Sequence, residues 1–489
     1  MIVILTVKAI YIKLTGKMIE IEKEGVSLEN WSKSRGLFLS SVATGAMLNP
    51  LNSSMIALAI PNIQKDFDLS FLTVSWLITS FYLAGAVTQP IAGKLGDLIG
   101  RRKLFLGGLI LVAISAMGAP LAPVFALLIM MRLFQAVGSG AIYPAGIGMV
   151  RDHIHERQGA ALGFIALSMS SMAALGPTIG GFLIAWGDWP AIFLVNIPVL
   201  LLCFILGWIV LPKDEAKKKL TRQELIQKMD LLGILFFSVG MIGLLLFLLS
   251  LKATVNYVAG IIGVISISLF VWHELKTKIP FIDIRLFHSN RKLSLVFLQY
   301  IVLNFIYYSL FFGLPAYFQD GLHLNVAHSG LLMLLVTGTG IITAPLIGRW
   351  VDRSGVNLPI LTGNLLIVIG SLLLWIFFSH VPVIVTVLMA SLIAAGCNFG
   401  NVTLQVAMLE ASPADMVGVS TGLYQTSRHF GSILSAVSLG LIFGAKFNPE
   451  HFTTLIIVFI VAGITVVLLG VKYSRTRDIG DRYLVPSDK

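Results

Sequence analysis

The chain has 489 residues, of which 56% are hydrophobic and 12% are charged, and this excess of apolar side chains excludes an ordinary soluble domain. The apolar residues form continuous runs rather than the alternating pattern of a β-barrel, and many runs reach the ~20 residues that a membrane-spanning helix needs. The net charge of +11 fits the excess of lysine and arginine in the cytoplasmic loops of membrane proteins, so nucleic-acid binding is not expected.

Residues 1–35 precede the first complete apolar run and are expected to form a cytoplasmic tail. The apolar stretch that opens the chain is too short to cross a membrane, and no small-residue cleavage site follows it. Met18 begins a polar stretch, so translation that starts at Met18 instead of Met1 is an open alternative.

Apolar runs of suitable length predict about fourteen transmembrane helices in an all-α membrane protein. The predicted spans are 36–61, 71–92, 104–122, 124–149, 160–186, 191–211, 231–251, 255–273, 293–318, 326–348, 358–379, 382–407, 418–444 and 453–472. An even number of crossings places both termini on one side. Lysine and arginine concentrate in the loops of that side, which is therefore predicted to be cytoplasmic.

A charged motif, Gly-x-x-x-Asp-x-x-Gly, occurs twice, after the second and tenth predicted helices. Its two copies divide the chain into two equivalent six-helix bundles with an inserted helix pair between them. The predicted units are a tail at 1–35, an N-terminal bundle at 36–211, a linker at 212–230, the inserted pair at 231–273, a loop at 274–292, a C-terminal bundle at 293–472 and a tail at 473–489.

The two copies of this motif are candidates for a gate that stabilises one conformation. A carboxylate at a helix end can cap a helix N-terminus and pair with arginine, and breaking such contacts would open one side of the protein. Anchoring of the helix ends at the membrane surface is the alternative. The candidate residues are Gly93, Asp97, Gly100, Arg101 and Arg102 in the first copy, and Gly348, Asp352 and Arg353 in the second.

Arg132 is the basic residue that the sequence places in the middle of an apolar run. Inserting arginine at the membrane centre costs at least roughly 2.5–3.5 kcal/mol, so its side chain is expected to face protein or a wet cavity. With Gln135, it is a candidate for coupling or for binding an anionic group, and a structural hydrogen-bond centre is the alternative.

Small residues recur in the fifth predicted helix at Gly176, Gly180 and Gly181, with Pro177 between them. Glycines three and four residues apart let a neighbouring helix approach closely, and proline favours a kink. We expect a hinge or a tight contact here rather than direct contact with a substrate.

A neutral, polar and aromatic cavity is predicted from amides and phenols within the apolar runs, because such groups usually face protein or a cavity. These candidates are Asn49, Asn52, Tyr300, Asn304, Tyr307, Asn398, Asn401, Gln405, Tyr424 and Gln425. Acidic residues are nearly absent from the runs. Asp320, just after the span 293–318, is the candidate proton site, and a solvated loop charge is the alternative.

Several of these motifs resemble those of a known family. The stretch Gly93–Lys103 resembles the signature turn of the major facilitator superfamily, and Arg132–Gly138 resembles its Arg-x-x-Gln-Gly-x-Gly element. Gly176–Gly181 is similar to the antiporter motif of drug exporters. With fourteen helices, the resemblance is to the fourteen-helix drug:proton antiporters of the EmrB/QacA type. Asn52 departs from this family, since it stands where a carboxylate is usual.

The resemblance implies a major-facilitator fold that exports hydrophobic or amphipathic compounds, of the multidrug type, by alternating access coupled to proton entry. The alternative is a carrier or facilitator of neutral or anionic metabolites or lipids, because Asn52 cannot carry a proton. No motif of an enzyme, a metal site or a cofactor site was found, so none of these is expected. The expected setting is the plasma membrane of a bacterium, as a monomer.

Overall fold

The computed structural model describes residues 35–74, 76–214, 221–251, 254–324, 326–378, 381–413, 416–443 and 449–476. The two candidate start residues, Met1 and Met18, lie outside these residues, as does most of the predicted C-terminal tail. Every regular element in the described ranges is a helix.

The N-terminal part of the chain forms the helices α3 (Arg35–Asp66), α4 (Phe71–Val74), α5 (Trp76–Ile99), α6 (Arg101–Gly118), η1 (Ala119–Leu121), α7 (Phe125–His153), α8 (Gln158–Gly187), α9 (Ala191–Leu194) and α10 (Asn196–Val210). The middle part forms α11 (Arg222–Met229), α12 (Leu231–Ser250), α13 (Tyr257–Lys276) and α14 (Ile284–Ser289). The C-terminal part forms α15 (Arg291–Ala316), η2 (Tyr317–Gly321), α16 (Val326–Thr337), α17 (Thr339–Ser354), α18 (Asn357–Phe377), α19 (Val383–Ala411), α20 (Val417–Phe443) and α21 (Pro449–Arg475).

Eleven helical segments of the described chain are long and apolar enough to cross a membrane. The long helices α3, α5 and α20 occupy three further predicted spans but do not meet the same criterion. Serine, amide or charged side chains interrupt their apolar character, which suits helices that face other helices. The number of fourteen crossings therefore stays a prediction.

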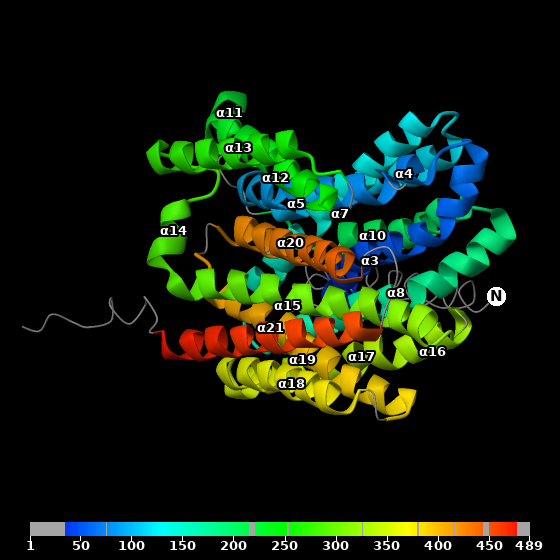
Figure 1. Cartoon of the computed structure of the whole chain (residues 1–489). Coiled ribbons are helices and arrows are strands. Elements are labelled where there is room, and N and C mark those ends of the chain that lie inside the picture. The colour runs from blue at the N-terminus through cyan, green and yellow to red at the C-terminus, as the bar shows by residue number, and fades with distance from the viewer. Residues whose placement is uncertain are drawn as a thin grey trace, which may run out of the picture.

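The two halves of the chain meet along two pairs of helices. Helix α20 lies between α5 and α15 in the bundle (Figure 1), so a helix of the C-terminal half packs directly on one of the N-terminal half. Helix α8 packs on α17 in the corresponding way. We call the end of the bundle at which Arg101, Arg151 and Arg353 lie the basic end.

Helices α12 and α13 form a pair beside the main bundle (Figure 1). They approach closely because both carry glycine at the crossing: a Cβ atom on Gly243 would lie 2.9 Å from the Cα atom of Gly263. Helix α12 also packs on both α5 and α20, so the pair contacts both halves. Exposed apolar side chains on the outer faces, such as Trp208 and Leu468, suit a lipid environment.

Candidate functional site

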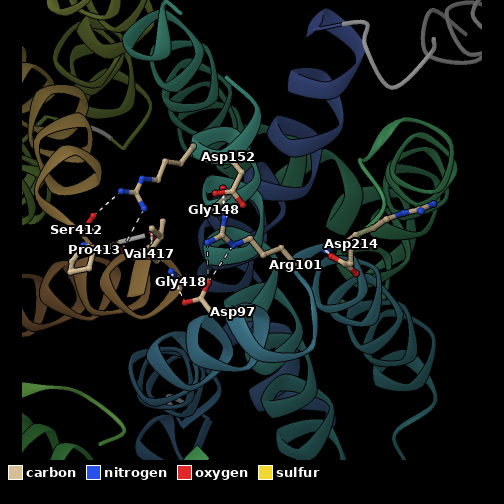
Figure 2. A network of polar contacts seen from close by, with 12 residues as sticks. Asp97, Arg101, Gly148, Asp152, Asp214, Ser412, Pro413, Val417 and Gly418 are labelled. Atoms are coloured by element: carbon tan, nitrogen blue, oxygen red, sulfur yellow. Dashed lines mark hydrogen bonds and ion pairs between the residues drawn. The ribbon is translucent and has the colours of Figure 1, made fainter. Parts of the chain in front are cut away.

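Asp97 joins the two halves at the basic end. Its Oδ2 atom accepts a hydrogen bond from the backbone N–H of Gly418, in the first turn of α20, at 3.0 Å (Figure 2). Its Oδ1 atom accepts from Arg101 Nη2 at 3.0 Å. A Cβ atom on Gly93 would lie 2.0 Å from the Gly418 carbonyl oxygen, so the approach of α5 to α20 requires glycine there. The carboxylate thus caps a helix of the other half, where the helix dipole favours a negative charge.

Asp352 makes the matching contact in the second copy of the motif. Its two carboxylate oxygens accept from the backbone N–H groups of Gly159 at 2.7 Å and Ala160 at 2.8 Å, in the first turn of α8. A Cβ atom on Gly348 would lie 2.4 Å from the Gly159 carbonyl oxygen. Each half therefore caps one helix of the other, and the sequence predicted the cap but not which helix receives it.

Arg101 extends the first contact into a network. Besides Asp97, its guanidinium donates to the carbonyl oxygen of Gly148 at 2.6 Å and pairs with Asp152, both on α7 (Figure 2). Arg151 crosses between the halves and donates to the carbonyl oxygen of Ser412 at 2.7 Å. The first copy is thus fixed both to its own half and to the other.

The neighbouring motif residues have other surroundings. Gly100 has φ of 109°, a conformation that favours glycine. The backbone N–H of Arg102 donates to Asp214 at 2.9 Å, and its guanidinium lies 5.5 Å from the centre of the Trp208 ring. Arg353 is exposed at the basic end.

Arg132 is buried inside the N-terminal half, with 1% of its surface exposed. It donates to Gln135 on its own helix and, at 3.4 Å, to the carbonyl oxygen of Leu77 on α5. Its guanidinium also lies 4.4 Å from the centre of the Phe81 ring. The side chain therefore faces protein, as expected, and links α7 to α5.

The glycines of α8 divide into two groups. A Cβ atom on Gly176 would lie 1.8 Å from Ser54 Oγ, and one on Gly180 would lie 3.2 Å from the Met55 side chain, so both face α3 closely. A Cβ atom on Gly181 would meet nothing within 4 Å. Pro177 lies within α8, between the two contacts. The close approach expected here rests on two of the three glycines.

A small cavity lies at the centre of the bundle, between the two halves. It has a volume of about 10 Å³, and its lining residues are Asn49, Gln89, Tyr143, Met169, Gln425 and Arg428. They come from α3, α5, α7, α8 and α20. Two predicted cavity residues, Asn49 and Gln425, are among them. A third, Gln405, is next to the lining, because it accepts a hydrogen bond from the Tyr143 hydroxyl at 2.7 Å.

The other predicted cavity residues make helix contacts in this conformation. Asn52 accepts from Asn196 Nδ2 at 2.8 Å, and Asn398 donates to Thr339 Oγ1 at 3.2 Å. Tyr300 stacks on Tyr424, with ring centres 3.6 Å apart. Further contacts join Asn304 to the Tyr300 carbonyl, Tyr424 to the Asn401 carbonyl, and the Tyr307 ring to Tyr308.

Arg428 is a cavity residue that the sequence analysis missed, since it singled out Arg132 as the basic residue within an apolar run. The signal was present: Arg428 lies inside the span 418–444, next to His429. Its Nε atom is buried and has no hydrogen-bond partner among the residues that the structure describes.

A buried acidic cluster connects the inserted pair to the first motif. Glu274 is 1% exposed and Asp230 is 9% exposed, although the sequence placed both merely at helix ends. Glu274 Oε1 and Asp230 Oδ2 each lie 2.5 Å from the Cβ position that Gly233 lacks, so they are close to each other. His273 pairs with Asp230 at 2.8 Å. Lys94 donates to the Pro280 carbonyl beside them.

The proton candidate Asp320 lies in η2, and the position of its side chain is outside what the structure describes. Its surroundings therefore add nothing to the expectation from the sequence.

Comparison with known proteins identifies the family. The model of the Major Facilitator Superfamily matches residues 42–436, which include both motif copies and the cavity. The chain belongs to the major facilitator superfamily. It is a multi-pass membrane transporter with bacterial relatives, as the resemblance of its motifs predicted.

Individual relatives agree with this. The chain is 55% identical to the "Uncharacterized MFS-type transporter YwoD" of Bacillus subtilis (strain 168), over 90% of this chain and 98% of the relative. It is 27% identical to the "Tetracenomycin C resistance and export protein" of Streptomyces glaucescens, over 83% of this chain and 76% of that one. The solved proton:xylose symporter XylE shares the fold, with a TM-score of 0.63, 14% identity, and coverage of 91% of this chain and 96% of that one.

Proposed function

We propose that this protein is a secondary exporter of amphipathic organic compounds that works by alternating access, as in fourteen-helix drug:proton antiporters. The observation that carries the proposal is the central cavity between two halves that contact each other reciprocally at the basic end. Because basic residues mark the cytoplasmic side, this conformation is closed toward the cytoplasm. Substrate enters from the cytoplasm once these contacts break.

The lining of the cavity supports an amphipathic substrate. Amides, a phenol and a thioether surround it, and such groups combine hydrogen bonding with apolar contact. The relative from Streptomyces glaucescens is described as an export protein for tetracenomycin C, which supports export rather than uptake. In this conformation the cavity has room for roughly one water molecule, so the substrate binds in a more open state.

The reciprocal Asp97 and Asp352 contacts act as the gate in this proposal. Each carboxylate stabilises a helix N-terminus of the other half by roughly 0.3–2 kcal/mol, and both contacts are lost when the halves separate at the basic end. Gly176 and Gly180 keep α8 close to α3, so that these two helices move together.

Proton entry is the proposed source of energy. Arg132 and Gln135 join α7 to the helix that carries the first motif, so they can transmit a change between the cavity and the gate. Asp320 remains the proposed proton-binding group near the outer end. Asn52 cannot titrate, and its amide instead pairs with Asn196.

A second candidate function is a carrier of neutral or anionic compounds without proton coupling. Arg428 in the cavity favours it, because the lining carries this cation and, within the described residues, no carboxylate.

Transport into everted membrane vesicles tests the proposal. Vesicles that contain the protein should accumulate amphipathic fluorescent compounds only while a pH gradient is present. Vesicles with Asp97→Asn serve as the matched control. If the compounds instead equilibrate across the membrane without a pH gradient, the second candidate is favoured. If vesicles with the protein take up no more compound than vesicles without it, export is refuted.

A further inference from the structure

Among the described residues, the lining of the central cavity carries one cation, Arg428, and no carboxylate. Arg428 lies on α20 among Asn49, Gln89 and Gln425, which are uncharged. Its Nε atom is buried without a hydrogen-bond partner. Arginine keeps its charge in proteins and presents several N–H donors in a fixed plane. A guanidinium held in this way is costly unless something else neutralises it.

Other buried polar atoms around the cavity also lack partners. Asn49 Oδ1, Gln89 Oε1 and Gln405 Nε2 form no hydrogen bond with the described residues. Buried polar groups without partners are rare in folded proteins, and each one needs a reason. With Arg428, these atoms come from two helices of the N-terminal half, α3 and α5, and two of the C-terminal half, α19 and α20, so they converge on one place instead of marking scattered packing faults.

The phenols around Arg428 cannot replace a counter-ion. Tyr82, Tyr143, Tyr300 and Tyr308 are near enough to interact electrostatically with the guanidinium. A phenol is neutral at physiological pH, because its ordinary pKa is about 10. These rings offer hydrogen bonds and apolar faces, which suit the uncharged body of an amphipathic molecule.

We propose that the cavity binds organic anions, with the Arg428 guanidinium pairing with a carboxylate or sulfonate and the surrounding amides and phenols contacting the rest of the molecule. This inference rests on the proposed export function and narrows its substrate class. A lipophilic cation, the usual probe of a multidrug exporter, meets like charge at Arg428 and is disfavoured.

Three probes with one fluorophore test the charge preference. Dansyl-leucine is anionic, its methyl ester is neutral, and dansylcadaverine is cationic. In vesicles that contain the wild-type protein, dansyl-leucine should be exported fastest. Arg428→Gln should lower dansyl-leucine transport and binding by about 10- to 100-fold, as expected for the loss of a hydrogen bond between charged groups, and leave the ester unchanged.

Two further variants separate binding from folding. Arg428→Lys keeps the charge and should retain part of the dansyl-leucine transport, which a purely structural role of the guanidinium would not give. Arg291→Gln removes an exposed charge from the start of α15 and should change nothing. Binding of dansyl-leucine to the purified full-length protein, measured by fluorescence anisotropy, gives the affinity independently of the transport cycle.

The outcomes distinguish this inference from the proposed function. Export of dansylcadaverine or the ester at least as fast as the acid, or equal dansyl-leucine transport by Arg428→Gln, would overturn the anion site and leave export standing. Export of none of the three probes by the wild-type protein would overturn both.

Discussion

The two copies of the motif make the same contact with different support. In both copies, the aspartate accepts a backbone hydrogen bond from the first turn of a helix in the other half. In both copies, the first glycine of the motif lets the two helices approach closely. The first copy adds Arg101, which ties Asp97 to α7, whereas Arg353 of the second copy is exposed. Glycine and carboxylate are therefore common to both contacts, whereas the support by an arginine, Arg101, belongs to the first.

The basic residue at the second position of the motif is also better supported in the first copy than in the second. Lys94 is half-buried and donates to backbone carbonyl oxygens of Pro280 and Phe281, next to the inserted pair. Arg349, at the same position in the second copy, is exposed. The inserted pair therefore supports only the first copy, and the following variants are chosen as matched pairs across the two copies.

The largest expected effect comes from the shared glycines. Gly93→Ala and Gly348→Ala each force a methyl group against a backbone carbonyl oxygen of the other half. Overpacking of this kind costs roughly 1–3 kcal/mol, so transport in vesicles should fall by up to about 100-fold for both variants. Gly107→Ala is the control, because its Cβ atom would meet nothing within 4 Å. An unaffected Gly93→Ala would show that the two halves need not approach so closely.

The next effect distinguishes the carboxylates. Asp97→Asn loses the ion pair with Arg101 and the charge at the α20 N-terminus, so transport should fall about tenfold. Asp352→Asn loses the charge at the α8 N-terminus and one of its two backbone hydrogen bonds, and transport should fall about threefold, because the amide oxygen still accepts the other. The amount of each variant in the membrane, measured in the same vesicle preparations, is the control. Equal losses would mean that Arg101 adds nothing to the first contact.

A smaller effect is expected at the second position of the motif. Lys94→Gln removes the charge between the first copy and the buried acids Asp230 and Glu274, and should lower the melting temperature of the purified protein by a few degrees, since partly buried pairs contribute about 1 kcal/mol. Arg349→Gln, its exposed counterpart, should leave the melting temperature unchanged. If both variants melted alike, the inserted pair would not support the first copy.

The smallest effect tests the acidic cluster itself. Glu274→Gln replaces a buried carboxyl group, one oxygen of which has no hydrogen-bond partner among the described residues, beside Asp230, but it also weakens the attraction to Lys94. Because the two changes oppose each other, we expect a shift in stability within about 1 kcal/mol. Glu274→Ala should be clearly more destabilising, since it also opens a cavity; thermal unfolding of both variants compares them directly. A large loss for Glu274→Gln would show that the pairing with Lys94 dominates.

The sequence predicted the helices and the motif well because both are local. Runs of apolar residues define the helices, and the spacing of Gly93 and Asp97 is visible without a structure. The partner of Asp97 is Gly418, more than three hundred residues away, and no local pattern identifies it. The rotation of each helix is also invisible, so the sequence could not separate Asn49, which lines the cavity, from Asn52, which packs against Asn196.

Arg428 and Glu274 show the other limit of the sequence. Both were present as charges in or beside apolar runs, but burial depends on neighbouring elements. The segment after α13 folds back so that the backbone N–H of Ile282 reaches Glu274 at 3.4 Å, and this turns a helix-end acid into a buried one.

The inserted pair contacts the two halves through surfaces of different chemistry. Toward α5 it presents the polar cluster around Lys94 beside apolar contacts that include Leu83 and Ala86. Toward α20 it packs on apolar side chains, among them Val419, Ile433 and Val437. Lipid tails are as apolar as these side chains, so they can replace the α20 contact at little cost, but they cannot replace the polar one. During the transport cycle the pair should therefore travel with the N-terminal half, and the membrane itself should fill the space that α20 leaves.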